Sequence, residues 1–193
     1  MSSRLVIRPE APDDVDSVRA LVADAFGDDV VAVLLDDLRR SFGWLDLSFV
    51  AELDGEIVGH VAYTRAWVDD ITEVVEVLVL SPLSISPFHT SKGIGTALVL
   101  ESIDQFGDRH EPLLFLEGNP GFYSRLGFVP AEPLGLRSPS SRIPSWAFQV
   151  RPLPGRPGRV TGALVYPDVW WRHDAVGLRA SPERPPGHGT MSP

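Results

Sequence analysis

The sequence of 193 residues contains no cysteine. This absence excludes a disulfide framework, a zinc site with thiolate ligands and a cysteine nucleophile. Long hydrophobic runs are missing too, because the strongest apolar stretch, residues 74–80, is too short to cross a bilayer and contains Glu76. The first residues lack the apolar segment of a signal peptide. We therefore predict a cytoplasmic protein with no membrane partner and no metal site.

Basic residues are also in the minority, with 17 Lys and Arg against 26 Asp and Glu, which gives a formal net charge of −9. A field of this sign repels nucleic acid, so we predict no nucleic-acid partner, and it attracts a cationic one. Acidic pairs such as residues 13–14 and 36–37 are nevertheless more often solvated surface than binding sites. Charge alone therefore indicates no specific partner.

The remaining composition is typical of a globular protein, with 44% hydrophobic and 22% charged residues. A chain of this length suits one domain and buries a core without metal or disulfide bonds. We predict a single domain over residues 1–174, with a core at 4–130 and C-terminal strands within 143–168. Residues 175–193, which are rich in Pro, Gly and Arg, are predicted to form a disordered tail.

Apolar periodicity and turn residues predict strands and helices along most of the domain. The pair Asp54-Gly55 predicts a hairpin, because it readily supplies the positive φ angles of a two-residue turn. Pro82 predicts a bulge or kink in a long strand, since proline cannot donate to a sheet ladder. Helices are expected at residues 15–25, 30–40, 93–106 and 121–126. Strands are expected at residues 5–8, 48–53, 56–64, 72–80, 113–117, 147–151 and 160–166.

Two glycines, Gly93 and Gly95, stand at the predicted start of a helix that follows a strand end. Glycine lets the backbone approach a phosphate closely, and the first-turn N–H groups and the helix dipole attract anions. Lys92 and Thr96 add a charge and a hydroxyl. A dinucleotide fingerprint would need a third glycine where the chain has Leu98, and the lysine of a P-loop is missing. These residues alone leave two interpretations, an anion site or a helix capped by a tight turn.

A family resemblance separates these interpretations. Residues 85–98, ISPFHTSKGIGTAL, resemble the acyl-CoA signature of the GNAT N-acetyltransferase superfamily. Residues 117–128, EGNPGFYSRLGF, resemble its second landmark, a short helix with a tyrosine followed by Gly-Phe. The order of elements is similar from about residue 5 to 128, and residues 143–168 resemble an uncharacterised bacterial branch of predicted N-acetyltransferases. The resemblance implies an α/β (α+β) fold, a mixed, mostly antiparallel twisted sheet that splays at its central strands after Ile85 and carries helices on both faces.

The same resemblance implies an acyl-CoA-dependent N-acyltransferase with acetyl-CoA as co-substrate and no metal. A primary amine of a small molecule or peptide would attack the thioester directly. The implied cofactor contacts are Leu83, Ser84, Ile85, Thr90, Ser91, Lys92, Gly93, Ile94, Gly95, Thr96, Asn119 and Tyr123. The family usually has Gln or Arg at the position of Thr90, so we expect weaker diphosphate binding here. The acceptor, the acyl chain preference and a homodimer all stay open.

Tyr123 is the predicted general acid, because a departing thiolate needs a proton and a nearby phenol can donate one. The alternative is that Tyr123 only packs as an aromatic wedge. An amine with a pKa near ~10.4 is neutral at pH 7 in about one molecule in a few thousand, so a base is needed as well. Glu76 is the predicted base, because strand alternation places it on the face of the apolar Leu78 and predicts desolvation. Glu73 and Glu117 are the other candidates.

Two further function classes remain open. The departure at Thr90 and the choice among several bases favour a non-catalytic acyl-CoA-binding or regulatory module on the same fold. A purely structural interaction domain is the third class. The candidates for lining an acceptor cleft are the loop at residues 138–144 and the tryptophans Trp67, Trp146, Trp170 and Trp171, although aromatic side chains more often pack in a core or at a sheet edge.

Overall fold

The computed structural model describes residues 4–154 and 159–177. The strands of these residues form a single sheet along the path β1 (Leu5–Pro9), β2 (Leu47–Leu53), β3 (Glu56–Asp69), β4 (Val74–Ile85), β5 (Leu113–Glu117), β8 (Phe148–Pro152) and β6 (Val129–Pro130). Off this path, β9 (Gly162–Val165) pairs with the far end of β3 and with β7 (Leu136–Arg137). The parallel pairs are β4 with β5 and β7 with β9, and the other pairs are antiparallel. The prediction of a mixed, mostly antiparallel sheet is confirmed.

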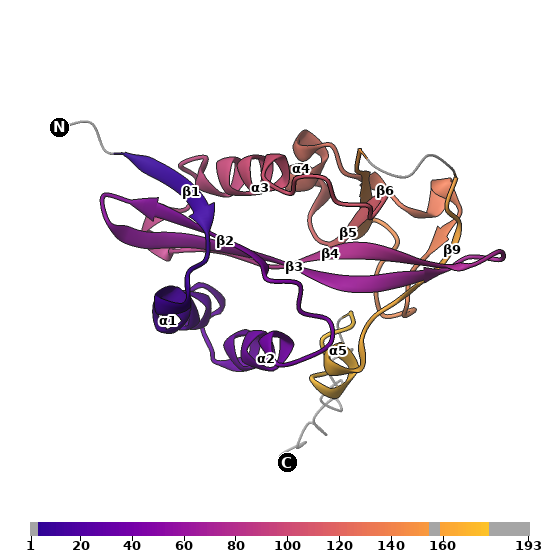
Figure 1. The fold of residues 1–193 in the computed structure, drawn as a ribbon, viewed down its shortest axis with the longest axis horizontal. Coiled ribbons are helices and arrows are strands. Elements are labelled where there is room, and N and C mark those ends of the chain that lie inside the picture. The colour runs from indigo at the N-terminus through magenta and orange to yellow at the C-terminus, as the bar shows by residue number, and fades with distance from the viewer. Residues whose placement is uncertain (1–3, 155–158, 178–193) are drawn as a thin grey trace, which may run out of the picture.

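Helices cover both faces of this sheet, as Figure 1 shows. One face carries α3 (Ile94–Asp104) and α4 (Pro120–Tyr123), and the opposite face carries α1 (Val15–Phe26), α2 (Val30–Arg39) and α5 (Asp168–Arg172). Short 3-10 turns lie at Pro12–Asp14, Pro87–His89, Ser124–Leu126 and Glu132–Leu134. None of the helices in the described residues has the length and apolar character that crossing a membrane requires.

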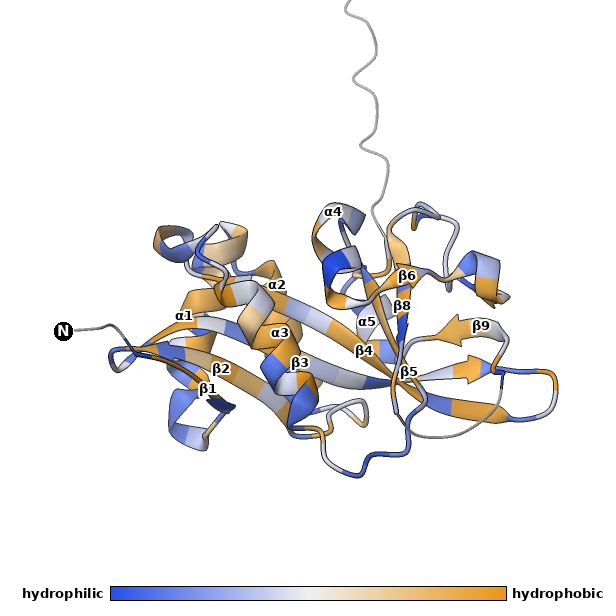
Figure 2. Ribbon diagram, turned by 90° about the horizontal axis from the view of Figure 1, so that it is seen from above, coloured by the Kyte–Doolittle hydropathy of each residue, from blue (hydrophilic) through white to orange (hydrophobic). Residues whose placement is uncertain are grey.

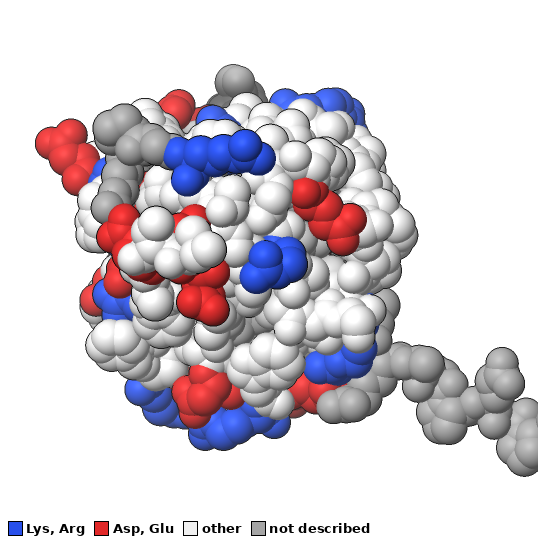
Figure 3. All heavy atoms as spheres, turned by 90° about the vertical axis from the view of Figure 1, so that its right-hand side faces the viewer, with Lys and Arg blue, Asp and Glu red and all other residues white. Residues whose placement is uncertain are grey.

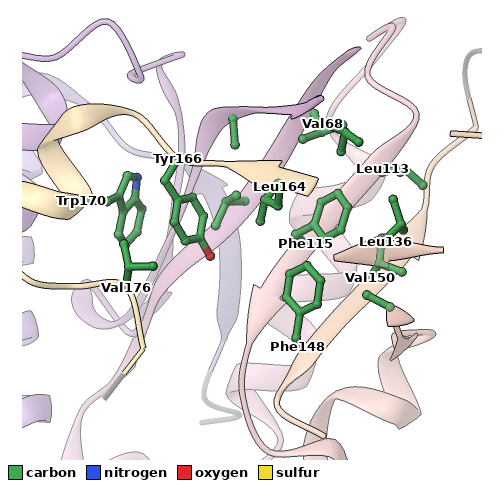
Figure 4. Packing of buried hydrophobic residues seen from close by; sticks show 14 of the residues in the cluster. Val68, Leu113, Phe115, Leu136, Phe148, Val150, Leu164, Tyr166, Trp170 and Val176 are labelled. Carbon is green, nitrogen blue, oxygen red and sulfur yellow. The ribbon is translucent and has the colours of Figure 1, made fainter. Parts of the chain in front are cut away.

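Each face of the sheet has its own hydrophobic core. Apolar residues line the strands beneath α3 in Figure 2, and the buried Leu98 of α3 packs among them. On the opposite face, Phe115 stacks on Phe148 with ring centroids 5.5 Å apart, and Tyr166 stacks on Trp170 at 5.2 Å (Figure 4). Because successive side chains of a strand point to opposite faces, each central strand supplies both cores.

The sheet opens between its two central parallel strands. In the described residues, β4 pairs with β5 only at Leu78 with Leu114 and at Val79 with Phe115. Beyond this point β4 continues beside β3 alone, and its register with β3 shifts opposite Pro82. The irregularity predicted at Pro82 is confirmed, and the splay leaves one edge of β4 without a neighbouring strand.

Two features differ from the prediction near the C-terminus. The helix α5 occupies a stretch in which the sequence pattern predicts no element, and it forms where the side chains of Val169 and Trp170 bury in the core. The chain also stays packed past residue 174, because Val176 is fully buried against the same core. The rest of the predicted tail, residues 178–193, lies outside the described residues.

Candidate active site

The free edge of β4 presents main-chain groups to the opening in the sheet. The N–H of Ser86 donates to the carbonyl oxygen of Val58 in β3 at 2.9 Å. In an antiparallel pair such contacts alternate along the strand. The main-chain groups of Leu83 and Ile85 therefore face away from β3, toward the side on which no strand of the described residues pairs. An extended ligand can hydrogen-bond to such an edge as if it were an added strand.

The turn before α3 presents N–H groups to the same opening. Ser91 and Gly93 have positive φ angles of 60° and 81°, which are typical of turns that point successive N–H groups at an anion. Within the helix, the N–H of Ala97 donates to the carbonyl of Gly93 at 3.0 Å. The N–H groups that precede Ala97 in the first turn have no helical acceptor, and the helix dipole adds partial positive charge there.

These two features line one pocket of about 540 Å³. Its walls are formed by Leu83, Ile85, His89, Thr90, Ser91, Gly93, Ile94, Gly95, Thr96, Phe122 and Arg125. A Cβ added at Gly95 would lie 3.5 Å from Cζ of Phe122 and 3.6 Å from Cγ1 of Ile85. A larger side chain at this position would project between two walls of the pocket, so glycine keeps the space open for a ligand.

Four residues predicted as cofactor contacts do not line this pocket. The main chain of Ser84 pairs with His60 in β3, and its side chain is buried on the face opposite Leu83. Lys92 is exposed on the turn outside the lining. Asn119 caps α4, since its Oδ1 accepts a hydrogen bond from the N–H of Gly121 at 2.8 Å. Asn119 also lines a different pocket.

Tyr123, the fourth of these residues, ends α4 and lies beside the end of β5. Its ring packs edge-on against Phe122 and Phe128, with centroids 4.8 and 5.7 Å apart, and a Cβ added at Gly118 would lie 2.8 Å from its Cδ2. Within the part of the chain that the structure describes, no hydrogen bond engages its hydroxyl. Burial raises the pKa of Tyr123 to about 12, so the phenol keeps its proton at neutral pH. The ring of Tyr123 therefore packs as an aromatic wedge, and its phenol is protonated at neutral pH.

Glu76 does not lie at the opening. Its carboxylate pairs with Nε of Arg65 at 3.0 Å, and its side chain is 28% exposed, so the predicted desolvation of Glu76 is wrong. It precedes Leu78, where β5 still flanks β4, whereas the splay begins after Val79. Alternation identifies the face of Glu76 but neither its partner nor its place relative to the opening. Glu73 is exposed in the turn that precedes β4.

Glu117 ends β5 at the opening. Its Oε1 accepts a hydrogen bond from the hydroxyl of Tyr166 at 3.0 Å, and burial raises the pKa of the carboxyl group. Alternation along β5 places Glu117 on the face of Phe115 and Leu116 on the face of α3. Glu117 lines a second pocket of about 540 Å³ together with Gly118, Asn119, Pro120, Pro144, Trp146, Ala147 and Gly177. This second pocket therefore adjoins the end of β5, whereas the first pocket is lined by β4, the α3 turn and α4.

Several lining residues are absent from the predicted site. Phe122 and Arg125 belong to the first pocket, and the guanidinium of Arg125 donates to the carbonyl of Gly121 at 2.9 Å. Gly121 and Arg125 are four residues apart, and this helical spacing is the sequence signal that predicts Arg125 beside Gly121. Pro144 belongs to the second pocket, and the sequence offers it, as the end of the loop at residues 138–144, and Trp146 only as general candidates for an acceptor cleft. No local pattern identifies them, because their loop meets β5 only in the folded chain.

Comparison with known proteins places this site in a family. A sequence model described as "Acetyltransferase (GNAT) family" matches residues 16–128. The Escherichia coli (strain K12) protein named "Uncharacterized N-acetyltransferase YhbS" is 33% identical over 164 residues, which cover 84% of this chain and 96% of YhbS. A crystal structure of YhbS from Escherichia coli in complex with CoA has a TM-score of 0.76 and 30% identity, and covers 89% of this chain and 94% of that chain. A GNAT family acetyltransferase from Brucella melitensis in complex with acetyl-CoA has a TM-score of 0.68 and 25% identity, with coverage of 86% and 98%. This chain therefore belongs to the GNAT acetyltransferase family.

Proposed function

We propose that this protein transfers the acetyl group of acetyl-CoA to a primary amine. The observation that carries the proposal is the pocket at the splay, where main-chain donors of the α3 turn and the free edge of β4 line one space. Family membership supports the same activity, as do the CoA and acetyl-CoA bound to the two similar crystal structures.

The residues of the pocket suit the parts of the proposed co-substrate. The first-turn N–H groups of Gly95 and its neighbours would hold the diphosphate, because they lack helical acceptors and lie at the positive end of the α3 dipole. The main-chain groups of Leu83 and Ile85 would hydrogen-bond the amides of the pantetheine arm. The hydroxyl of Thr90, which donates to the carbonyl of Pro87 at 3.3 Å, contributes less than a longer donor would.

Tyr123 supplies the proton in this proposal. When bound, the thioester provides an electrophilic carbonyl carbon, so that a carbon–nitrogen bond to the amine forms while the carbon–sulfur bond breaks. The phenol of Tyr123 donates its proton to the departing sulfur and recovers one from solvent, and the nitrogen loses a proton as the amide forms. The contacts with Phe122 and Phe128 fix the orientation of the Tyr123 ring, so less entropy is lost in reaching the reactive geometry.

Release of CoA thiol tests the proposal directly. Because the chain has no cysteine, a disulfide reagent added to purified protein and acetyl-CoA reports only the released CoA. We expect thiol release that depends on an added primary amine, together with thermal stabilisation by CoA. Stabilisation without release for a broad amine panel would instead indicate a binding or regulatory module. No stabilisation by either CoA or acetyl-CoA would overturn the enzyme and the binding module together and leave an interaction domain.

A further inference from the structure

The second pocket is the strongest candidate for an acceptor site. We propose that the pocket of Glu117, Pro144 and Trp146 binds the acceptor, and that the acceptor is a primary amine with one positive charge and an apolar or aromatic body. This inference rests on the proposed acetyl transfer, because it assigns the second substrate of that reaction. The pocket of about 540 Å³ falls in the size range of small-molecule sites.

The charge of the pocket comes from one carboxylate. Glu117 is the acidic residue among the described residues of the lining, and Tyr166 and the N–H of Gly177 both donate to it. A carboxylate has about four lone-pair positions, so these two donors leave room for an ammonium group. The nearby Arg142 does not compete strongly, because its Nη1 pairs with Oδ1 of Asp174 at 2.8 Å. One carboxylate matches one ammonium and leaves further charges of a polyamine unpaired.

The rest of the pocket is apolar. The indole of Trp146 is 59% exposed, and Pro144 and Pro120 border the same space. The amide oxygen of Asn119 already accepts a hydrogen bond from the chain, so only its N–H donors remain. An amino sugar with many hydroxyl groups would lose more hydrogen bonds to water than this lining can replace. An alkyl or aryl body gains from burial against the indole.

The overall charge of the protein does not explain amine selection at this pocket. On the face viewed in Figure 3, acidic and basic side chains are interspersed among uncharged ones rather than gathered by sign. Interspersed charges are screened within about 8 Å at physiological ionic strength. Recognition of the ammonium therefore depends on the carboxylate inside the pocket, and selection among amines depends on its apolar walls.

Glu117 also has the position of a base. The residue that follows it, Gly118, lies against the ring of the proton donor Tyr123, because a Cβ added there would fall 2.8 Å from Cδ2 of that ring. In the proposed step the carboxylate of Glu117 removes one proton from the bound ammonium, so that the neutral nitrogen carries the lone pair that attacks the thioester carbonyl. The proton then passes from Glu117 to solvent. The groups that face this carboxyl are the Tyr166 hydroxyl, the Gly177 N–H and the Arg142 guanidinium.

A homologous series of amines tests the class of acceptor. Ethylamine, butylamine, hexylamine and 2-phenylethylamine carry one ammonium each and differ in apolar bulk, while spermidine and kanamycin carry several amines. We expect kcat/KM to rise by up to about fourfold for each methylene buried, and to be lowest for kanamycin. Trp146→Ala should flatten this dependence on chain length, and Trp171→Ala, an exposed tryptophan outside both pockets, should leave it unchanged.

Glu117→Gln tests the base and keeps an acceptor for the Tyr166 hydroxyl. We expect kcat/KM for hexylamine at pH 7 to fall by about 10² to 10⁴, with the acid limb of the pH profile lost and CoA stabilisation kept. Glu101→Gln, an exposed residue of α3, is the matched control and should keep both. An unchanged chain-length dependence in Trp146→Ala, an unchanged pH profile in Glu117→Gln, or a preference for spermidine or kanamycin would overturn this inference while leaving acetyl transfer intact. Loss of CoA binding by the wild type would instead overturn the proposed function.

Discussion

Replacing Tyr123 by phenylalanine removes one oxygen from the site and changes little else. The ring contacts with Phe122 and Phe128 do not involve the hydroxyl, and no described residue hydrogen-bonds to it. Removing a hydroxyl that makes no hydrogen bond leaves no other group unpaired, so the free energy of unfolding should change by about 1 kcal/mol or less. Because the phenol has a pKa of about 12, it is protonated throughout the neutral range, and its removal is felt at every pH at which the enzyme is assayed.

The size of the kinetic effect follows from the leaving group. A departing thiolate with a pKa of about 8.5 ends as a thiol at pH 7, and without Tyr123 its proton has to come from water. General acid catalysis contributes about 10²- to 10⁴-fold in enzymes. We therefore expect the Tyr123→Phe variant to lose at least about 10²-fold in kcat, while its dissociation constant for CoA changes by less than about twofold.

Calorimetric titration with CoA and the thiol-release assay measure these two quantities separately. Tyr63→Phe is the matched control, since its hydroxyl hydrogen-bonds the buried Ser102 at 2.6 Å and Tyr63 lines neither pocket. That control should lower the melting temperature and leave kcat unchanged. A Tyr123→Phe variant whose kcat stays within about twofold of the wild type would refute proton donation by this residue, and the packing role alone would remain.

The remaining predictions concern the pockets and the fold. Gly95→Leu should abolish thermal stabilisation by CoA at concentrations that stabilise the wild type, since the side chain would project between pocket walls. Gly118→Ala should lower kcat by about 10²-fold with CoA binding kept, because a Cβ displaces the Tyr123 ring. Trp170→Ala should cost about 3–5 kcal/mol in chemical denaturation, whereas Trp170→Phe should cost far less, because the buried indole N–H has no partner among the described residues. Hydrogen bonds from the Thr161 and Thr72 N–H groups lower the pKa of Asp70 to about 2. The ionised carboxylate therefore stabilises the fold above its ordinary pKa of 3.8, and this stabilisation is lost as the pH falls toward 2. The melting temperatures of the wild type and of Asp70→Asn should differ at pH 7 and converge near pH 2.

Local patterns predict the elements of the fold well. The hairpin at Asp54-Gly55, the irregularity at Pro82 and the helix start at Gly93 each follow from backbone chemistry of one or two residues, and all are present. The second pocket has no such origin. It forms where the end of β5, the loop that carries Trp146 and the segment that ends at Gly177 meet, and contacts between segments so distant in sequence leave no period or motif.

The positions of Glu76 and Ser84, which the sequence pattern does not predict, have a related cause. Alternation correctly separates the two faces of a strand, but it carries no information on what stands beside the strand. Glu76 shares a face with Leu78, yet it pairs with Arg65 on β3, and it lies before the point at which β4 and β5 pair and then separate. The prediction groups Ser84 with its neighbours, although an antiparallel ladder turns the main chain of every second residue toward β3. The environment of both residues depends on which strand or side chain lies beside them, and this is set by the tertiary structure.

The same alternation bears on the proposed use of one strand end by two substrates. Leu116 and Glu117 are consecutive, so they point to opposite faces of β5: Leu116 is buried on the α3 side, and Glu117 lines the second pocket on the other side. Because Gly118 has no side chain, the ring of Tyr123 can pack directly against the strand end. In the proposed mechanism the proton donor Tyr123 therefore lies on the α4 side of this strand end, and the carboxylate of Glu117 lies on the opposite side. The two proposed proton transfers thus use residues at the end of β5 and beside it, and the loops around this end would determine which amine enters.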